Sequence, residues 1–150
     1  MKKLASLFIV VLVAAYTWYG NNPERVELPS APNHTAVAAD QDQILSNAYK
    51  NKRSDIQVRG AGTVEKILPD DNKGSRHQKF ILRLASGQTI LVAHNIDLAP
   101  RVAGLQTGDN IAFYGEYEWT DRGGVVHWTH HDPAGRHVGG WLEHGGRRYE

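Results

Sequence analysis

The fold class of this chain is indicated first by one stretch, Ile56-Gln-Val-Arg-Gly-Ala-Gly-Thr-Val-Glu-Lys-Ile-Leu68. Its apolar residues alternate loosely with polar ones, which is typical of a strand with one buried face. Two glycines, Gly60 and Gly62, interrupt the pattern, and glycine inside a strand marks a bulge or a sharp bend. We therefore expect a long, bent strand at the start of a β domain.

Four further strands follow this one. Residues 77–84 alternate most clearly, and Ser86-Gly87 predicts a tight hairpin into the next strand. The glycine-rich turn Asp121-Arg-Gly-Gly124 predicts a second hairpin. The predicted strands after the first are residues 77–84, 88–94, 111–119 and 125–131.

The segment 95–105 breaks the strand pattern and predicts a short helix or a turn-rich crossover. The resulting order, β-β-β-α-β-β, is similar to the usual layout of the oligonucleotide/oligosaccharide-binding (OB) fold, a five-stranded Greek-key barrel. A mainly β, small, five-stranded OB-like barrel is the predicted architecture, and a meander or small sandwich would show nearly the same pattern. The tail 139–149 is too glycine-rich for a strand to be assigned.

A helix is expected just before the first strand, at residues 40–52, with Asp40 as its N-cap. Residues 20–39 hold three prolines among small and polar residues, which is typical of a linker. The predicted organisation is a segment 1–19, a linker 20–39 and a single domain over residues 40–150.

The N-terminus, Met1-Lys-Lys3 followed by an apolar run at residues 4–19, predicts a signal peptide with cleavage after Ala15. We therefore expect an exported protein, periplasmic or secreted. The alternative is an anchor in the inner membrane through residues 4–19, with Trp18 and Tyr19 at the interface. Contact with a membrane is expected only through this segment, if it stays uncleaved.

Composition excludes several classes of protein. Cys is absent, so a bound metal needs His, Asp or Glu ligands, and a thiol nucleophile is excluded. From Ser54 to Glu150 the chain has 11 Lys and Arg against 12 Asp and Glu, which disfavours generic nucleic-acid binding. Phosphate-binding loop, dinucleotide-binding and serine-hydrolase motifs are missing from the sequence.

Five of the eight histidines lie between residues 127 and 144. A turn at Pro133 would fold His137 back toward the strand end, which makes a zinc site, or a site for another divalent transition metal, chemically feasible. The alternative is a set of histidines that cap turns at one rim of the domain. The candidate ligands are His127, His130, His131 and His137, with Asp132, His94 and Glu116 as secondary candidates.

Glu116 and Glu118 share one face of the strand at 111–119, next to the strand that carries His127 if the hairpin forms. Paired carboxylates can supply ligands or acid–base groups, although a solvated outer face is the commoner arrangement and is favoured. For His94, at the end of its strand, a structural role is favoured over a catalytic one.

The sequence resembles a family of exported bacterial proteins known only as domain of unknown function 3465. The resemblance implies export and one small domain, and it brings no activity with it. It covers about two-thirds of the chain and extends through Trp141 and His144. The strings that carry it are Leu68-Pro-Asp-Asp71, His77-Gln-Lys-Phe80, His94-Asn-Ile-Asp-Leu-Ala-Pro-Arg101, Gly115-Glu-Tyr-Glu-Trp119 and His127-Trp-Thr-His-His-Asp-Pro133.

Three functional hypotheses remain open. The first is a binding module without turnover, whose unknown ligand or envelope-protein partner meets the rim formed by residues 121–124 and 127–137. The second is a metal-dependent hydrolase, of nuclease or phosphoesterase type, with Asp132 or Glu116 as base. The third is a periplasmic protein that buffers metal ions through surface histidines.

Overall fold

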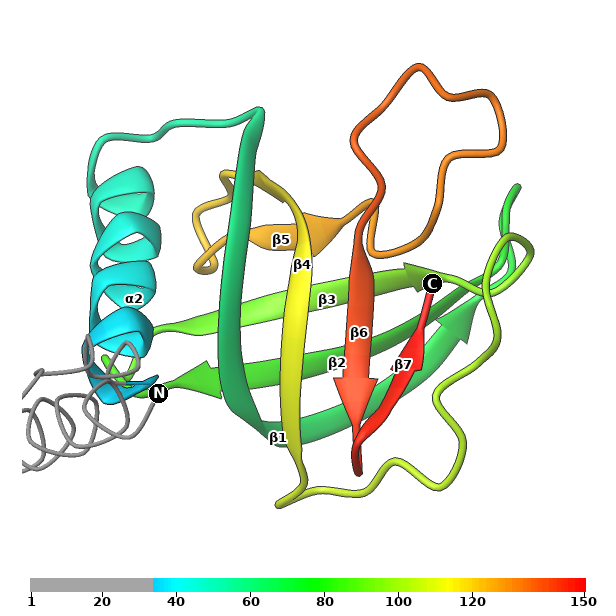
Figure 1. The fold of residues 1–150 in the computed structure, drawn as a ribbon, viewed down its shortest axis with the longest axis horizontal. Coiled ribbons are helices and arrows are strands. Elements are labelled where there is room, and N and C mark those ends of the chain that lie inside the picture. The colour runs from blue at the N-terminus through cyan, green and yellow to red at the C-terminus, as the bar shows by residue number, and fades with distance from the viewer. Residues whose placement is uncertain (1–33) are drawn as a thin grey trace, which may run out of the picture. The chain divides into compact units, whose positions relative to one another are not determined.

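The computed structural model describes residues 34–150, with side chains from residue 40 onward. These residues form one helix, α2 (His34–Lys50), and a seven-stranded mixed sheet (Figure 1), which confirms the mainly β prediction. The strands are β1 (Ile56–Asp71), β2 (His77–Leu84), β3 (Thr89–Asn95), β4 (Asn110–Glu118), β5 (Val125–His127), β6 (Trp141–His144) and β7 (Arg147–Tyr149).

Five of these strands pair in a closed ring, in the order β1-β2-β3-β5-β4, with β4 pairing back to β1. The β3–β5 pair is parallel, and the other neighbours in the ring are antiparallel. Strand β1 can serve both neighbours because it is long: residues 56–63 pair with β4, and β2 pairs with residues 62–71. The predicted set of five strands is therefore present.

The predicted bend in β1 lies where it passes from one partner to the other. Gly62 is paired with both Ile111 and Leu84. A Cβ atom at Gly60 would lie 2.6 Å from the ring of Phe113. Glycine is needed here because the core aromatic ring lies directly against the backbone.

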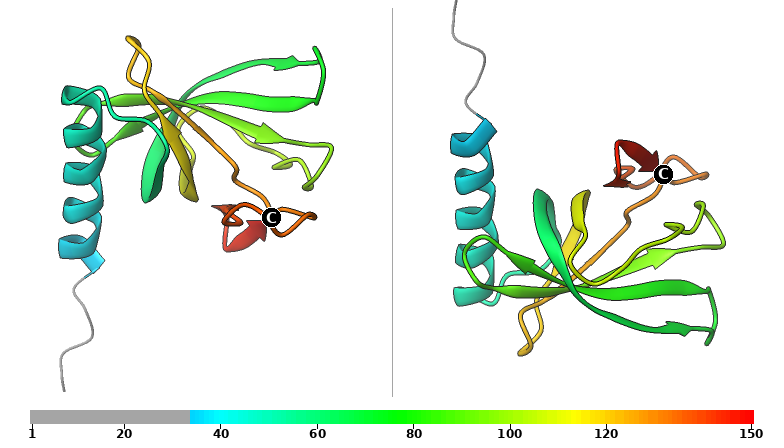
Figure 2. Two further views of the ribbon diagram at one scale, coloured as in Figure 1. Left: turned by 90° about the horizontal axis from the view of Figure 1, so that it is seen from above. Right: turned by 90° about the horizontal axis from the view of Figure 1, so that it is seen from below.

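The core combines the inward faces of the strands with one side of α2. Phe80, Phe113 and Tyr117 are fully buried in it. Leu45 and Ala48 of α2 join the same cluster, and Figure 2 shows the helix beside one end of the strands. Because α2 begins at His34, Asp40 lies inside the helix, and the prediction that it is the N-cap is wrong.

The segment between β3 and β4 is a series of turns, so the turn-rich alternative holds and the predicted helix is absent there. Pro100 interrupts the segment, and Gly104 and Gly108 have φ values of 69° and 95°, which a right-handed helix does not allow. Strand β5 is also shorter than predicted. It ends at His127 because Trp128 has a φ of 51°.

The glycine-rich tail, to which the sequence assigned no strand, forms the hairpin β6–β7. Strand β6 pairs with β4 and extends the sheet beyond the ring. Its turn contains Gly145 and Gly146 with φ values of 57° and 76°, the conformation that a two-residue hairpin turn requires. These glycines mark a turn between strands.

The predicted signal peptide or anchor at residues 1–19, and the linker up to residue 33, lie outside the described residues. Within residues 34–150, no helix has the length and hydropathy needed to cross a membrane.

Candidate metal centre

The ring brings two carboxylates and one imidazole together on its outer face. In β4, residues 111, 113, 115 and 117 are buried, so Glu116 and Glu118 point outward. Strand β5 lies antiparallel to β4, and its register sets His127 directly opposite Glu116. The hairpin at 121–124 therefore produces this juxtaposition.

One ligand atom from each of Glu116, Glu118 and His127 lies within 4.8 Å of the other two. His127 Nε2 is 3.4 Å from Glu116 Oε1 and 3.9 Å from Glu118 Oε1. Ligand atoms of a tetrahedral zinc site lie about 3.3 Å apart, as follows from metal–ligand bonds of about 2.0–2.1 Å. The three groups are therefore spaced almost as a metal ion requires.

His127 is suited to ligation in its protonation state as well as its position. Burial lowers the pKa of His127 below its usual value, against the opposing effect of Glu116 and Glu118. The neutral ring has a lone pair to offer. Its Nε2 atom is buried and has no hydrogen-bond partner among the described residues.

His137 contacts the same group from the loop that joins β5 to β6 (orange in Figure 1). Its Nδ1 donates to the carbonyl of Val138 at 2.7 Å, and its Nε2 lies 2.6 Å from Glu116 Oε2. Both oxygens are acceptors, so both ring nitrogens carry protons. Burial opposes this charge, but the hydrogen bonds to Glu116 and Val138 outweigh it and raise the pKa of His137.

The loop places His137 through two side chains. The Asp132 carboxylate accepts backbone N–H bonds from Ala134, Arg136 and His137 at 3.0, 2.7 and 2.9 Å. These bonds hold the pKa of Asp132 below its usual value, the one from Ala134 contributing most. Trp128 stacks on the His137 ring at 4.0 Å with an angle of 9° between the planes.

Trp128 adopts this position at a cost in backbone strain. Its φ of 51° is unusual for a bulky residue and costs about 1–3 kcal/mol. Such strained residues cluster at functional sites. The strained turn directs the chain off β5 and puts the indole against His137.

The other predicted histidines lie apart from this group. His130 is buried and its Nδ1 donates to the carbonyl of His131, while His131 is exposed. His94 is fully buried, 2.9 Å from Thr129 Oγ1 and 3.1 Å from the carbonyl of Pro100. Of the four candidate ligands, the structure brings His127 and His137 to the carboxylates.

Two members of the site were not selected from the sequence. Glu118 was noted beside Glu116 but was not included among the candidate ligands. Gln57 is paired with Glu116 across β1 and β4, and its buried Nε2 atom finds no hydrogen-bond partner in the part of the chain that the structure describes. The position of Gln57 beside Glu116 depends on the pairing of β1 with β4, which the sequence does not show. Glu118 could have been selected from the sequence, because it lies two residues after Glu116 on the same strand face.

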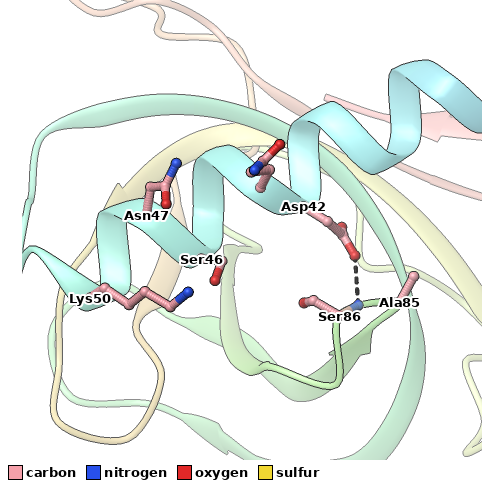
Figure 3. Close-up of a pocket in the computed structure, with 7 residues that line it drawn as sticks. Asp42, Ser46, Asn47, Lys50, Ala85 and Ser86 are labelled. Atoms are coloured by element: carbon pink, nitrogen blue, oxygen red, sulfur yellow. Dashed lines mark hydrogen bonds between the residues drawn. The ribbon is translucent and has the colours of Figure 1, made fainter.

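Two adjoining pockets, of about 470 and 340 Å³, open beside this group over β2, β3 and β5. His127, His77 and Ala93 line both of them. A third pocket of about 420 Å³ lies between α2 and the β2–β3 turn (Figure 3). There the Asp42 carboxylate accepts a hydrogen bond from the backbone N–H of Ser86 at 2.8 Å, and this bond links the helix to the turn.

The protein is thus a small, mainly β domain in which five strands close into a ring, and Glu116, Glu118 and His127 gather on the outer face of that ring. The family model of DUF3465, described as a protein of unknown function, matches residues 26–150. The chain therefore belongs to this family, as the resemblance in its motifs predicted. No curated protein matches it.

Proposed function

We propose that the domain binds a divalent transition-metal ion, preferably Zn²⁺, through Glu116 Oε1, Glu118 Oε1 and His127 Nε2. The observation that carries this proposal is the buried, unpartnered Nε2 of His127 facing two carboxylates. A buried nitrogen without a partner is costly, and a metal ion would supply the missing interaction. An imidazole ligand favours zinc and its neighbours over calcium or magnesium.

In this proposal, His137 orients Glu116 rather than binding the ion. The two oxygens of Glu116 face different partners: Oε2 accepts from His137, and Oε1 faces His127. Metal-binding carboxylates are commonly held by such outer hydrogen bonds. Three protein ligands leave a fourth position for water or a ligand, as in catalytic zinc sites.

The test is zinc affinity measured by competition with a chromophoric chelator. We expect one ion per chain, and a loss of more than about 100-fold in His127→Gln and Glu116→Gln, because even outer-shell changes cost about 10–100-fold. For His137→Gln we expect zinc affinity to fall by about 10–100-fold, because His137 holds Glu116 without binding the ion. His131→Gln is the matched control, because His131 belongs to the same histidine-rich segment but is exposed.

A second measurement is thermal stability. Free Zn²⁺ at 100 times its dissociation constant stabilises a folded protein by about 2.7 kcal/mol. We expect EDTA to remove this gain in the wild type, and zinc to have no effect on Glu116→Gln. Equal losses of zinc affinity in His131→Gln and His127→Gln would contradict the proposed ligand set and favour weak binding by scattered histidines.

A further inference from the structure

We propose that the groove beside the cluster binds a small organic anion, a carboxylate or phosphate monoester with an apolar body. Its charged head would lie between the metal ion and Lys79. This inference rests on the proposed function, because the ion's open fourth position supplies one of the two contacts.

The groove follows from the register of three strands. Lys79 of β2 is paired with Ala93 of β3. Strand β5 runs parallel to β3 with Leu91 opposite Val125 and Val92 opposite Val126, so His127 follows beside Ala93. The short Ala93 side chain thus lies between the long side chains of Lys79 and His127, and forms a low floor.

The distance across this floor suits a small ligand. Two strand spacings separate β2 from β5, which is about 10 Å. The pocket over Lys79, Ala93 and His127 has a volume of about 470 Å³, within the range of about 300–1,000 Å³ for small-molecule sites. Its apolar lining comes from Leu91, Ala93 and Val125, against which an apolar body can pack.

Polar groups line the two sides of the groove. Lys79 Nζ is 3.7 Å from Asp71, a long and partly exposed contact that leaves the ammonium free to turn to another anion. His77 donates through Nδ1 to the carbonyl of Ser75 at 2.8 Å, so its Nε2 remains available at the groove. Glu118 lies on the opposite side.

The charges make anion binding depend on the metal ion. Without a cation, Glu118 and Asp71 outweigh Lys79 in the groove, and an anion is repelled. A divalent ion bound by Glu116, Glu118 and His127 neutralises the two carboxylates and presents its open coordination position to an anion. The ion and Lys79 then attract the same head group from opposite sides of Ala93.

Calorimetry of the full chain with phenylphosphonate, benzoate and inorganic phosphate tests this inference, with and without one equivalent of Zn²⁺. We expect phenylphosphonate or benzoate to bind the zinc-loaded protein at least tenfold more tightly than the zinc-free protein. The tighter of the two identifies the head group. Inorganic phosphate, which lacks an apolar body, is expected to bind more weakly.

Lys79→Gln is expected to weaken binding of the preferred anion by about tenfold or more, the usual loss for one hydrogen bond to a charged group. Its matched control is Lys66→Gln, an exposed lysine of β1 outside the groove. Zinc affinity, titrated separately, separates the two proposals. This inference alone is overturned if zinc binds normally and any one of three results is found. These are no anion binding, anion binding that Zn²⁺ does not change, or anion binding that Lys79→Gln does not weaken. Absence of zinc binding overturns both.

Discussion

Asp132 shows how one side chain can shape a site that it does not enter. Its carboxylate accepts three backbone N–H bonds and fixes the turn that carries His137. We predict that Asp132→Ala lowers the free energy of unfolding by about 1–3 kcal/mol, the cost of leaving such groups unpaired. Zinc affinity should also fall by about tenfold because His137 loses its position over Glu116.

Urea denaturation and zinc titration measure the two effects of Asp132→Ala. Asp121→Ala is the control, since Asp121 is an exposed residue of the neighbouring turn. If both variants lose stability equally, or if Asp132→Ala binds zinc as tightly as the wild type, the carboxylate does not position the loop.

For individual side chains, the sequence located part of the site. The histidine-rich segment pointed to His127 and His137, and alternation along one strand put Glu116 and Glu118 on a common face. It could not separate His127 from His131, because that choice depends on where β5 ends. The strand ends at the left-handed conformation of Trp128, and nothing in the local sequence requires that conformation.

Among the elements, the β4–β5 connection sets the register of the site, and its Gly124 lies directly against the buried ring of Tyr117. Its φ is 103°, and an added Cβ would overlap the ring of Tyr117. We predict that Gly124→Ala destabilises the domain by about 2 kcal/mol or more beyond the left-handed penalty of about 1–2 kcal/mol. The measurement is urea denaturation against Gly87→Ala.

Gly87 is the matched control because its φ is 85° and an added Cβ would meet no described atom within 4 Å. The difference between the two variants isolates the overlap with Tyr117 from the backbone penalty. Similar losses in both would mean that the Tyr117 ring moves aside, and that the connection tolerates a side chain.

Elements with strict alternation were predictable, and elements that depend on glycine were not. Residues 77–84 alternate so clearly that β2 has the predicted bounds. Strands β6 and β7 were not assigned, because two of the tail's glycines form the hairpin turn between them, while glycine also occurs in loops without structure. The segment after β3 could be predicted only as a short helix or a turn-rich crossover, because scattered apolar residues fit both, and the structure has the turns.

At the scale of the whole molecule, ring closure connects the core to the site. The parallel pairing of β3 with β5 places β5 between β3 and β4, so His127 faces Glu116 on one side and the groove on the other. This non-local pairing follows from no short stretch of sequence. It makes the outer face of the ring a rigid support for the metal group and for Lys79.

Closure also encloses His94, whose environment makes stability depend on pH. Its Nε2 donates to the carbonyl of Pro100, and its Nδ1 accepts from the Thr129 hydroxyl. Burial is the main cause that lowers the pKa of His94 to about 4, from 6.5 in the unfolded chain. Between these values the unfolded chain binds more protons, so acid favours unfolding.

We predict that the free energy of unfolding falls by about 2 kcal/mol from pH 7 to pH 4.5 because of His94 alone, at about 1.4 kcal/mol per pH unit of difference. The raised pKa of His137 has the opposite sign, but its stabilising contribution is complete below pH 6.5 and is lost only at higher pH. Urea denaturation of the wild type and His94→Gln at both pH values measures the difference between their slopes. An NMR titration of the wild type gives the pKa directly should the variant not fold, and a value near 6.5 would show that the closed ring does not keep His94 neutral.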